Sequence, residues 1–193
     1  SAIRSILQPK GGEPNLEGII IAVPYTKIEE IVDEDKKVTL KENTFYILST
    51  PIESNISCTI NPEYLTRGIF QVPVFESNVN IEGSFSPLEY EHTNIDKDSI
   101  QWDKAVVLFG VKNKKTLLET PQVYIGRDKL EVSLSEPTFS SPFSNTVFFD
   151  LPKKFLNRDF EYSIDAKIQG GNIFKITPIA RDTKIQINSS WSS

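Results

Sequence analysis

Residues able to do chemistry are few in this chain, and their spacing matches no known reactive centre. His92 is the only histidine and Cys58 the only cysteine, so metal sites built on two or three histidines are excluded by number, and no internal disulfide can form. A nucleophilic hydrolase needs a serine or cysteine beside an oriented base. His92 lies in an acidic stretch, and no Gly-x-Ser-x-Gly turn presents a serine. We therefore predict no catalytic residue, no metal and no cofactor.

Paired carboxylates are a second route to catalysis. Two of them roughly 5 to 9 Å apart can hydrolyse a glycosidic bond, and the chain has 26 acidic residues from which the sequence selects no pair. Trp102 and Trp191 could stack on a sugar ring, although each fits a core or interface anchor better. A carbohydrate-binding or carbohydrate-active β-sandwich therefore stays open as an alternative.

The charge balance argues against nucleic acid as a partner. The chain has 21 basic and 26 acidic residues, a net charge of -5, and no stretch that gathers Lys and Arg on one face. No window approaches the roughly 18 consecutive apolar residues that span a bilayer as a helix. Cys58 shares a strand face with Ile56 and Ile60, which indicates a buried packing role for the thiol.

The elements that must position any site are strands. Apolar residues alternate over residues 70–74 and again over 79–85, and turn formers at 76–78 separate the two runs, so residues 67–85 predict a hairpin. Alternation over 162–169 predicts a half-buried strand that a tight turn at Gly170 and Gly171 joins to a partner strand at 174–178.

Further strands are expected along the rest of the chain. The β-branched run 16–25 predicts a strand buried on both faces, and residues 28–32 and 38–48 predict two arms around a solvated charged tip at 33–37. A strand over 52–60 is expected to end at Asn61 and Pro62, and another to run from Trp102 to Val111.

Strands that recur about every ten residues with almost no helical period predict an all-β fold. We expect an antiparallel β-sandwich, or a barrel-like sandwich, built from successive hairpins with at most one or two short helical turns, one of them capped by Asp96. Residues 1–15 are interpreted as an approach segment and 16–191 as the β domain, which could divide into two subdomains meeting near 86–101.

Four motifs, taken in chain order, carry a likeness to a known family. They are Leu16-Glu17-Gly18 with Val23-Pro24-Tyr25, the run 67–75 with Gly83-Ser84-Phe85, Trp102 followed by Ala105, and Ser189-Ser190-Trp191. In order and spacing they resemble the extracytoplasmic region of the CreD family of bacterial inner-membrane proteins. The candidate motif and structural residues are Arg67, Gly68, Phe70, Pro73, Gly83, Trp102 and Trp191.

The resemblance implies a setting rather than a reaction. It implies a periplasmic domain, a transmembrane helix ending just before Ile3, further helices beyond the chain, and a link to envelope phenotypes such as colicin tolerance. It offers no catalytic residues. Where the family carries Ser-Asp-x-Arg-Gly-Ile, this chain has residues 112–117, Lys-Asn-Lys-Lys-Thr-Leu, so any ligand role of that loop is in doubt. We interpret Arg67 as structural, paired with a carboxylate.

From these observations we expect a non-enzymatic periplasmic domain that acts through contacts with a protein or an envelope component such as peptidoglycan. The membrane would be reached through segments outside this chain. Besides the carbohydrate alternative, a structural spacer that holds the membrane helices is a third interpretation. An aromatic-lined groove with two facing acids would favour an enzyme, whereas an exposed apolar patch would favour a partner.

Overall fold

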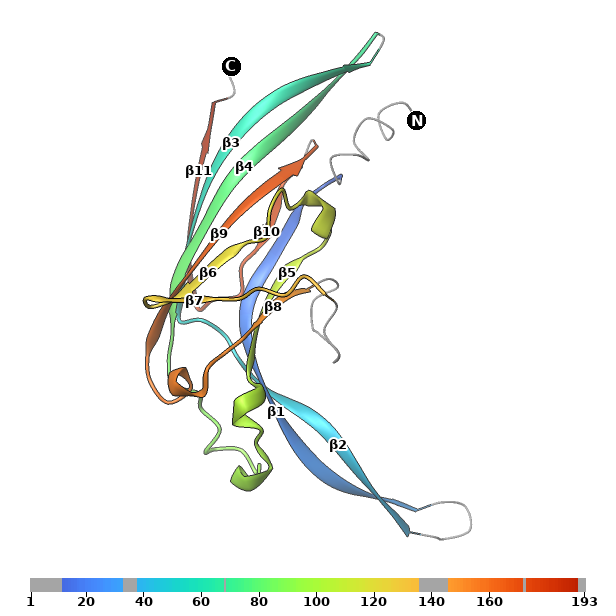
Figure 1. Cartoon of the computed structure of the whole chain (residues 1–193), viewed down its shortest axis with the longest axis vertical. Helices are drawn as coiled ribbons and strands as arrows, with labels where there is room; N and C mark the ends of the chain where they lie inside the picture. The colour runs from blue at the N-terminus through green and yellow to red at the C-terminus, as the bar shows by residue number, and fades with distance from the viewer. Residues whose placement is uncertain (1–11, 33–37, 68, 136–145, 172, 191–193) are drawn as a thin grey trace.

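A computed structural model of the chain describes residues 12–32, 38–67, 69–135, 146–171 and 173–190, with the side chains of Arg67 and Phe70 left out. The described residues form two β-sheets that pack face to face (Figure 1). One sheet has the order β10-β1-β5-β8, with β2 also paired to β1; the other has the order β11-β3-β4-β9-β6-β7. The predicted all-β sandwich is therefore confirmed.

The two sheets contain eleven strands in the described residues. In the first sheet they are β1 (Asn15–Val32), β2 (Val38–Ser49), β5 (Val106–Val111), β8 (Thr146–Asp150) and β10 (Lys175–Thr177). In the second they are β3 (Glu53–Arg67), β4 (Phe70–Phe85), β6 (Gln122–Ile125), β7 (Asp128–Leu130), β9 (Phe160–Gly170) and β11 (Asp182–Ser189). All pairings are antiparallel except β1 with β10 and β3 with β11, which are parallel.

Helical structure in the described ranges is limited to four 3-10 turns of three residues each, namely η2 (Lys97–Ser99), η3 (Trp102–Lys104), η4 (Lys114–Thr116) and η5 (Lys153–Phe155). The expected capping of η2 is present, because the Asp96 carboxylate accepts a hydrogen bond from the Asp98 N–H at 3.1 Å. The strand expected to begin at Trp102 begins instead at Val106, since Trp102 lies in a turn.

The core lies between the two sheets and takes its residues from both. Along β9 the side chains of Tyr162, Ile164, Ala166 and Ile168 are buried, as their alternation predicts. The run after Gly18 is buried on both faces of β1, which is also as expected. Its odd-numbered residues join the central core, and its even-numbered ones pack in a smaller cluster with Val106 and Leu108.

The hairpin expected within residues 67–85 is wrong. Residues 76–78 lie in the middle of β4, which pairs in unbroken register with β3, and pair there with β9 as well. The apolar pattern changes phase at this point because the buried face changes. Val72 and Val74 are buried on one side of the strand, and Phe75, Val79 and the following alternate residues on the other. The hairpin joins β3 to β4 instead.

The strand end expected at Asn61 and Pro62 is also wrong, since β3 continues to Arg67. Proline lacks an N–H and is tolerated where a strand has a neighbour on only one side. Pro62 pairs with β4 in a part of β3 beyond the last residue paired with β11, and Pro73 lies in β4 beyond its last pair with β9. Each proline therefore lies where one side of its strand has no ladder partner among the described residues.

The tight turn expected at Gly170 and Gly171 is a third error. Gly170 does not have a positive φ, and the next strand, β10, pairs in parallel with β1 in the opposite sheet. The two glycines therefore begin a crossing between sheets. Gly170 passes so close to Pro14 that a Cβ would lie 2.3 Å from the proline Cδ, and the Gly171 N–H donates to the Gly12 carbonyl at 2.9 Å.

Two long hairpins extend beyond the sandwich at opposite ends (Figure 1). The β1–β2 arm confirms the predicted pair of arms, whose register runs to Val32 opposite Val38; its charged tip at 33–37 lies outside the described residues. The β3–β4 hairpin projects from the other end, where β11 ends at Ser189 beside Ile60.

Candidate functional site

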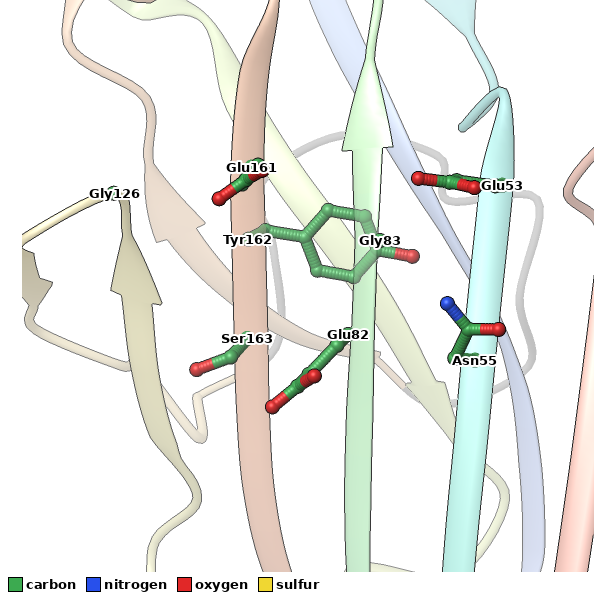
Figure 2. A pocket seen from close by; sticks show the side chains of 8 residues that line it. All are labelled: Glu53, Asn55, Glu82, Gly83, Gly126, Glu161, Tyr162 and Ser163. Atoms are coloured by element: carbon green, nitrogen blue, oxygen red, sulfur yellow. The ribbon is translucent and has the colours of Figure 1, made fainter.

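A groove on the outer face of the second sheet gathers three glutamates. Glu53 on β3, Glu82 on β4 and Glu161 on β9 come from adjacent strands, because Glu53 and Glu161 both pair with Ser84, two residues along from Glu82. Figure 2 shows them around a cavity of about 360 Å³. The lining residues are Glu53, Asn55, Glu82, Gly83, Gly126, Glu161, Tyr162 and Ser163.

This groove does not present an aromatic platform to a sugar. Its one aromatic residue, Tyr162, is buried and packs with Phe85 in the core, with ring centroids 5.4 Å apart. The three glutamate side chains are exposed to solvent. Within the described ranges, no three His, Cys, Asp or Glu side chains are grouped closely enough to hold a metal ion. The groove therefore has acids without the stacking surface that the carbohydrate alternative requires.

Tyr162 is nevertheless the most perturbed group beside the groove. Burial raises the pKa of its phenol to about 12, the nearby Ser54 hydroxyl lowers it in part, and the charge of Glu53 raises it further. The Tyr162 Oη is buried and has no hydrogen-bond partner in the structure. The Ser54 hydroxyl is therefore near the phenol without forming a hydrogen bond of acceptable geometry with it. A phenol in this state keeps its proton at neutral pH and does not act as a base.

A second site is an apolar cleft at the end of the sandwich where the β3–β4 hairpin projects. The cleft has a volume of about 320 Å³. It lies between β3, β4, β11 and the segment after β9, and its lining residues are Ile60, Pro73, Val74, Phe75, Gly171, Phe174, Ile187 and Ser189. The Phe75 and Phe174 rings meet at a centroid distance of 5.9 Å and form one wall.

The apolar surface continues from the cleft along β11. Ile185 and Ile187 pair with Ile56 and Cys58 of β3. Because Ile56 and Cys58 are buried, the two β11 isoleucines lie on the inner face of the sheet. They are nevertheless 44% and 55% exposed. In the described part of the chain, β11 pairs only with β3, so its outer edge presents a backbone ladder without a strand partner. An apolar cleft thus adjoins an open sheet edge.

The predicted motif residues do not converge on one site. Pro73 lines the apolar cleft and Gly83 the acidic groove. Trp102 packs edge-on against Tyr90 at 5.1 Å beside the core, which is an anchoring role. Arg67 and Phe70 form the last residue pair of the β3–β4 ladder.

Two of the motif residues, Gly68 and Trp191, lie outside the described residues. The pairing of Arg67 with a carboxylate stays a prediction, since its side chain is also outside them. The altered loop at 112–117 forms η4, and the Lys114 ammonium donates hydrogen bonds to the carbonyls of Leu134 and Ser135, at 2.7 and 3.3 Å. Lys114 therefore connects η4 to the segment at residues 134–135 by hydrogen bonds.

These features define a two-sheet β domain with an acidic groove on one face and an apolar cleft at one end. The family profile described as "Inner membrane protein CreD" matches residues 1–193, which is the whole chain, so the chain belongs to the CreD family. The resemblance carried by the four sequence motifs is thereby confirmed. No curated protein and no solved structure matches the chain. Across the described residues, no helix has the length and apolar character needed to cross a membrane.

Proposed function

We propose that this chain is a non-enzymatic periplasmic domain of a CreD-family inner-membrane protein and contributes to envelope integrity by binding a protein partner. The membrane is reached through segments outside this chain. The observation that carries the proposal is the apolar cleft beside the open β11 edge, since Ile187 belongs to both.

The chemistry of this surface suits an extended apolar segment of a protein. An added strand would pair with the outer backbone edge of β11 over residues 183–188, where the described residues supply no second strand, and its side chains would cover Ile185 and Ile187. Removing apolar surface from water contributes about 25 cal/mol per Å². Affinity would come from the ladder and from this burial, and specificity from the side chain that enters the cleft beside Phe174.

The acidic groove favours a second candidate, a carbohydrate-active or carbohydrate-binding domain, because Glu53 and Glu161 flank Ser84 on neighbouring strands. Such a function would need one of the glutamates. A structural spacer, the third candidate, would need neither the cleft nor the groove. Single substitutions at the two sites therefore separate the three candidates.

The experiment is complementation of a strain that lacks the full-length protein, with detergent sensitivity and colicin tolerance as readouts. We expect Ile187→Asp to fail to restore the wild-type phenotype, because a buried charge opposes an apolar partner. Glu82→Gln and Glu161→Gln, the matched surface controls, should complement fully. Comparable protein levels and melting curves are required of all variants. If the glutamate variants fail and Ile187→Asp complements, the carbohydrate function is favoured and the partner proposal is rejected.

A further inference from the structure

We propose that the tip of the β3–β4 hairpin contacts the lipid bilayer, with Ile69 placed among the lipids and Tyr64 at the level of the headgroups. The inference rests on the membrane attachment in the proposed function and adds the surface of the domain that faces the bilayer.

The position of the tip follows from two backbone hydrogen bonds and one strand pairing. The first described residue, Gly12, accepts a hydrogen bond from Gly171, and the neighbouring Gly170 pairs with Phe75 of β4. The last described residue, Ser190, donates to the Ile60 carbonyl at 3.2 Å. Both ends of the described chain therefore lie at the end of the sandwich from which the hairpin projects (Figure 1).

The hairpin extends past the level of these two residues. Ile69 lies six positions before Phe75, and a strand rises about 3.3 Å per residue, so the tip reaches roughly 20 Å further. If the chain meets the membrane at this end, the tip is the part of the domain that reaches it first. The β1–β2 arm points the opposite way, away from that surface.

The side chains of the tip suit a membrane surface. Ile69 is 93% exposed and Tyr64 is 59% exposed, so an apolar residue stands at the apex with an amphipathic aromatic below it. Tyrosine favours the boundary between apolar and aqueous phases. Residues 64–71 contain one arginine and no acidic residue, although the whole chain carries a net charge of -5. An anionic bilayer would therefore not repel this segment as it would the rest of the domain.

Exposure by itself does not single out this tip. Ile28 and Leu40 on the β1–β2 arm are each 65% exposed. Their cross-strand neighbours, however, are Glu42 and Glu30 respectively, which anionic headgroups repel. Position and charge thus distinguish the β3–β4 tip from the arm, and Leu40 supplies a matched control for Ile69.

The test attaches the chain to vesicles by a polyhistidine tag after Ser193. The vesicles contain phosphatidylethanolamine, phosphatidylglycerol and a nickel-chelating lipid. An environment-sensitive thiol probe is placed at Ile69→Cys or, as the control, at Leu40→Cys. Cys58 stays unlabelled at neutral pH, because it is buried and burial raises its pKa to about 11. Tyr64→Cys is labelled with and without Ile69→Asp.

We expect the Ile69 probe to shift its emission to the blue on tethering and to be quenched by spin-labelled lipid, while the Leu40 probe does neither. Ile69→Asp should reverse the smaller shift of the Tyr64 probe. An unchanged Ile69 probe, or equal shifts at Ile69 and Leu40, overturns the proposal. A shift without vesicles that grows with protein concentration overturns it in favour of a second copy of the chain.

The tether replaces the natural membrane attachment, so this result is independent of the complementation assay. If the Ile69 probe is unchanged on tethering while Ile187→Asp fails to complement, only the lipid contact is rejected. Failure of the cleft variants to alter the phenotype rejects the partner proposal and leaves the probe result standing.

Discussion

Tyr162 and Gly83 face each other on paired strands, and the tyrosine ring occupies the space in which a side chain on Gly83 would lie (Figure 2). A Cβ at residue 83 would be 2.6 Å from the Tyr162 Oη and 2.1 Å from the backbone carbonyl oxygen of Glu53. The close approach of three strands, β3, β4 and β9, therefore depends on glycine at this position. The three glutamates of the acidic groove belong to the same strands.

Gly83→Ala should lower the free energy of unfolding by about 2–4 kcal/mol, because the added methyl group would overlap with neighbouring atoms that have no space to move into. Urea unfolding followed by circular dichroism measures this. A Gly83→Ala, Tyr162→Leu double variant, which removes the tyrosine ring, should not restore stability. The added methyl group at residue 83 would still clash with the backbone carbonyl oxygen of Glu53, which cannot move aside as a side chain can. Glu82→Ala, on the exposed face of the same strand, is the control and should change stability by roughly 0.5 kcal/mol or less. Equal stability of Gly83→Ala and wild type would contradict the geometry.

Tyr162→Phe should leave stability at neutral pH unchanged or raise it by about 1 kcal/mol. The Tyr162 Oη is buried without a hydrogen-bond partner, so its removal takes away a desolvation penalty and leaves the ring contacts with Phe85 in place. Thermal unfolding at pH 7 is the measurement. A loss of several degrees in melting temperature would show that the hydroxyl does have a partner.

The same tyrosine should make the protein sensitive to alkaline pH. Burial raises its pKa from 10.0 to about 12, so above pH 10 the unfolded chain gives up a proton that the folded chain keeps. The stabilisation is complete below pH 10 and is lost as pH rises toward 12. In Tyr162→Phe the decline of melting temperature between pH 9 and 11 should be shallower than in wild type. Parallel declines would assign the effect to other groups.

The sequence was informative where one local pattern decided the structure. Alternation over 162–169 predicted β9, and the two apolar arms around 33–37 predicted the β1–β2 hairpin, because a strand with one buried face has a period of two residues. The buried role of Cys58 follows from the same rule. The all-β class needed only the recurrence of such patterns.

The sequence was misleading where contacts with a strand far away in the sequence decide which residues are buried. The phase change at 76–78 resembled a turn because the second buried face of β4 cannot be foreseen from neighbours in sequence. Gly170 resembled a turn residue, although its smallness serves the close passage of Pro14. The acidic groove could not be predicted either, since Glu53, Glu82 and Glu161 meet only through the register of three strands.

The prolines of β3 and β4 lead to a paired test. Pro62→Ala should change stability by less than about 1 kcal/mol, because one side of β3 has no described partner at that point. Thr59→Pro should be far more harmful, by about 3 kcal/mol or more, since Thr59 pairs with both Asn78 and Asn188. Thr59 is exposed on the outer face of the sheet, whereas Pro62 is half-buried on the inner face opposite Phe75, so Thr59→Ala serves as the control that isolates the backbone effect at residue 59. Similar effects of the two substitutions would argue against the β11–β3 pairing.

Cys58 provides a probe of the same sheet in the native state. Burial raises its pKa from 9.0 to about 11, so at pH 8 the fraction present as thiolate falls about a hundredfold, and the side chain is also shielded by the core. The reaction with a chromogenic disulfide reagent should therefore be at least a hundredfold slower in the folded protein than in urea. Leu40→Cys, whose new thiol lies on the exposed β1–β2 arm, should react at the rate of an unfolded thiol and serves as the control. Fast labelling of Cys58 under native conditions would mean that β11 and β3 separate readily, and the apolar cleft that they line would then not be a preformed binding site.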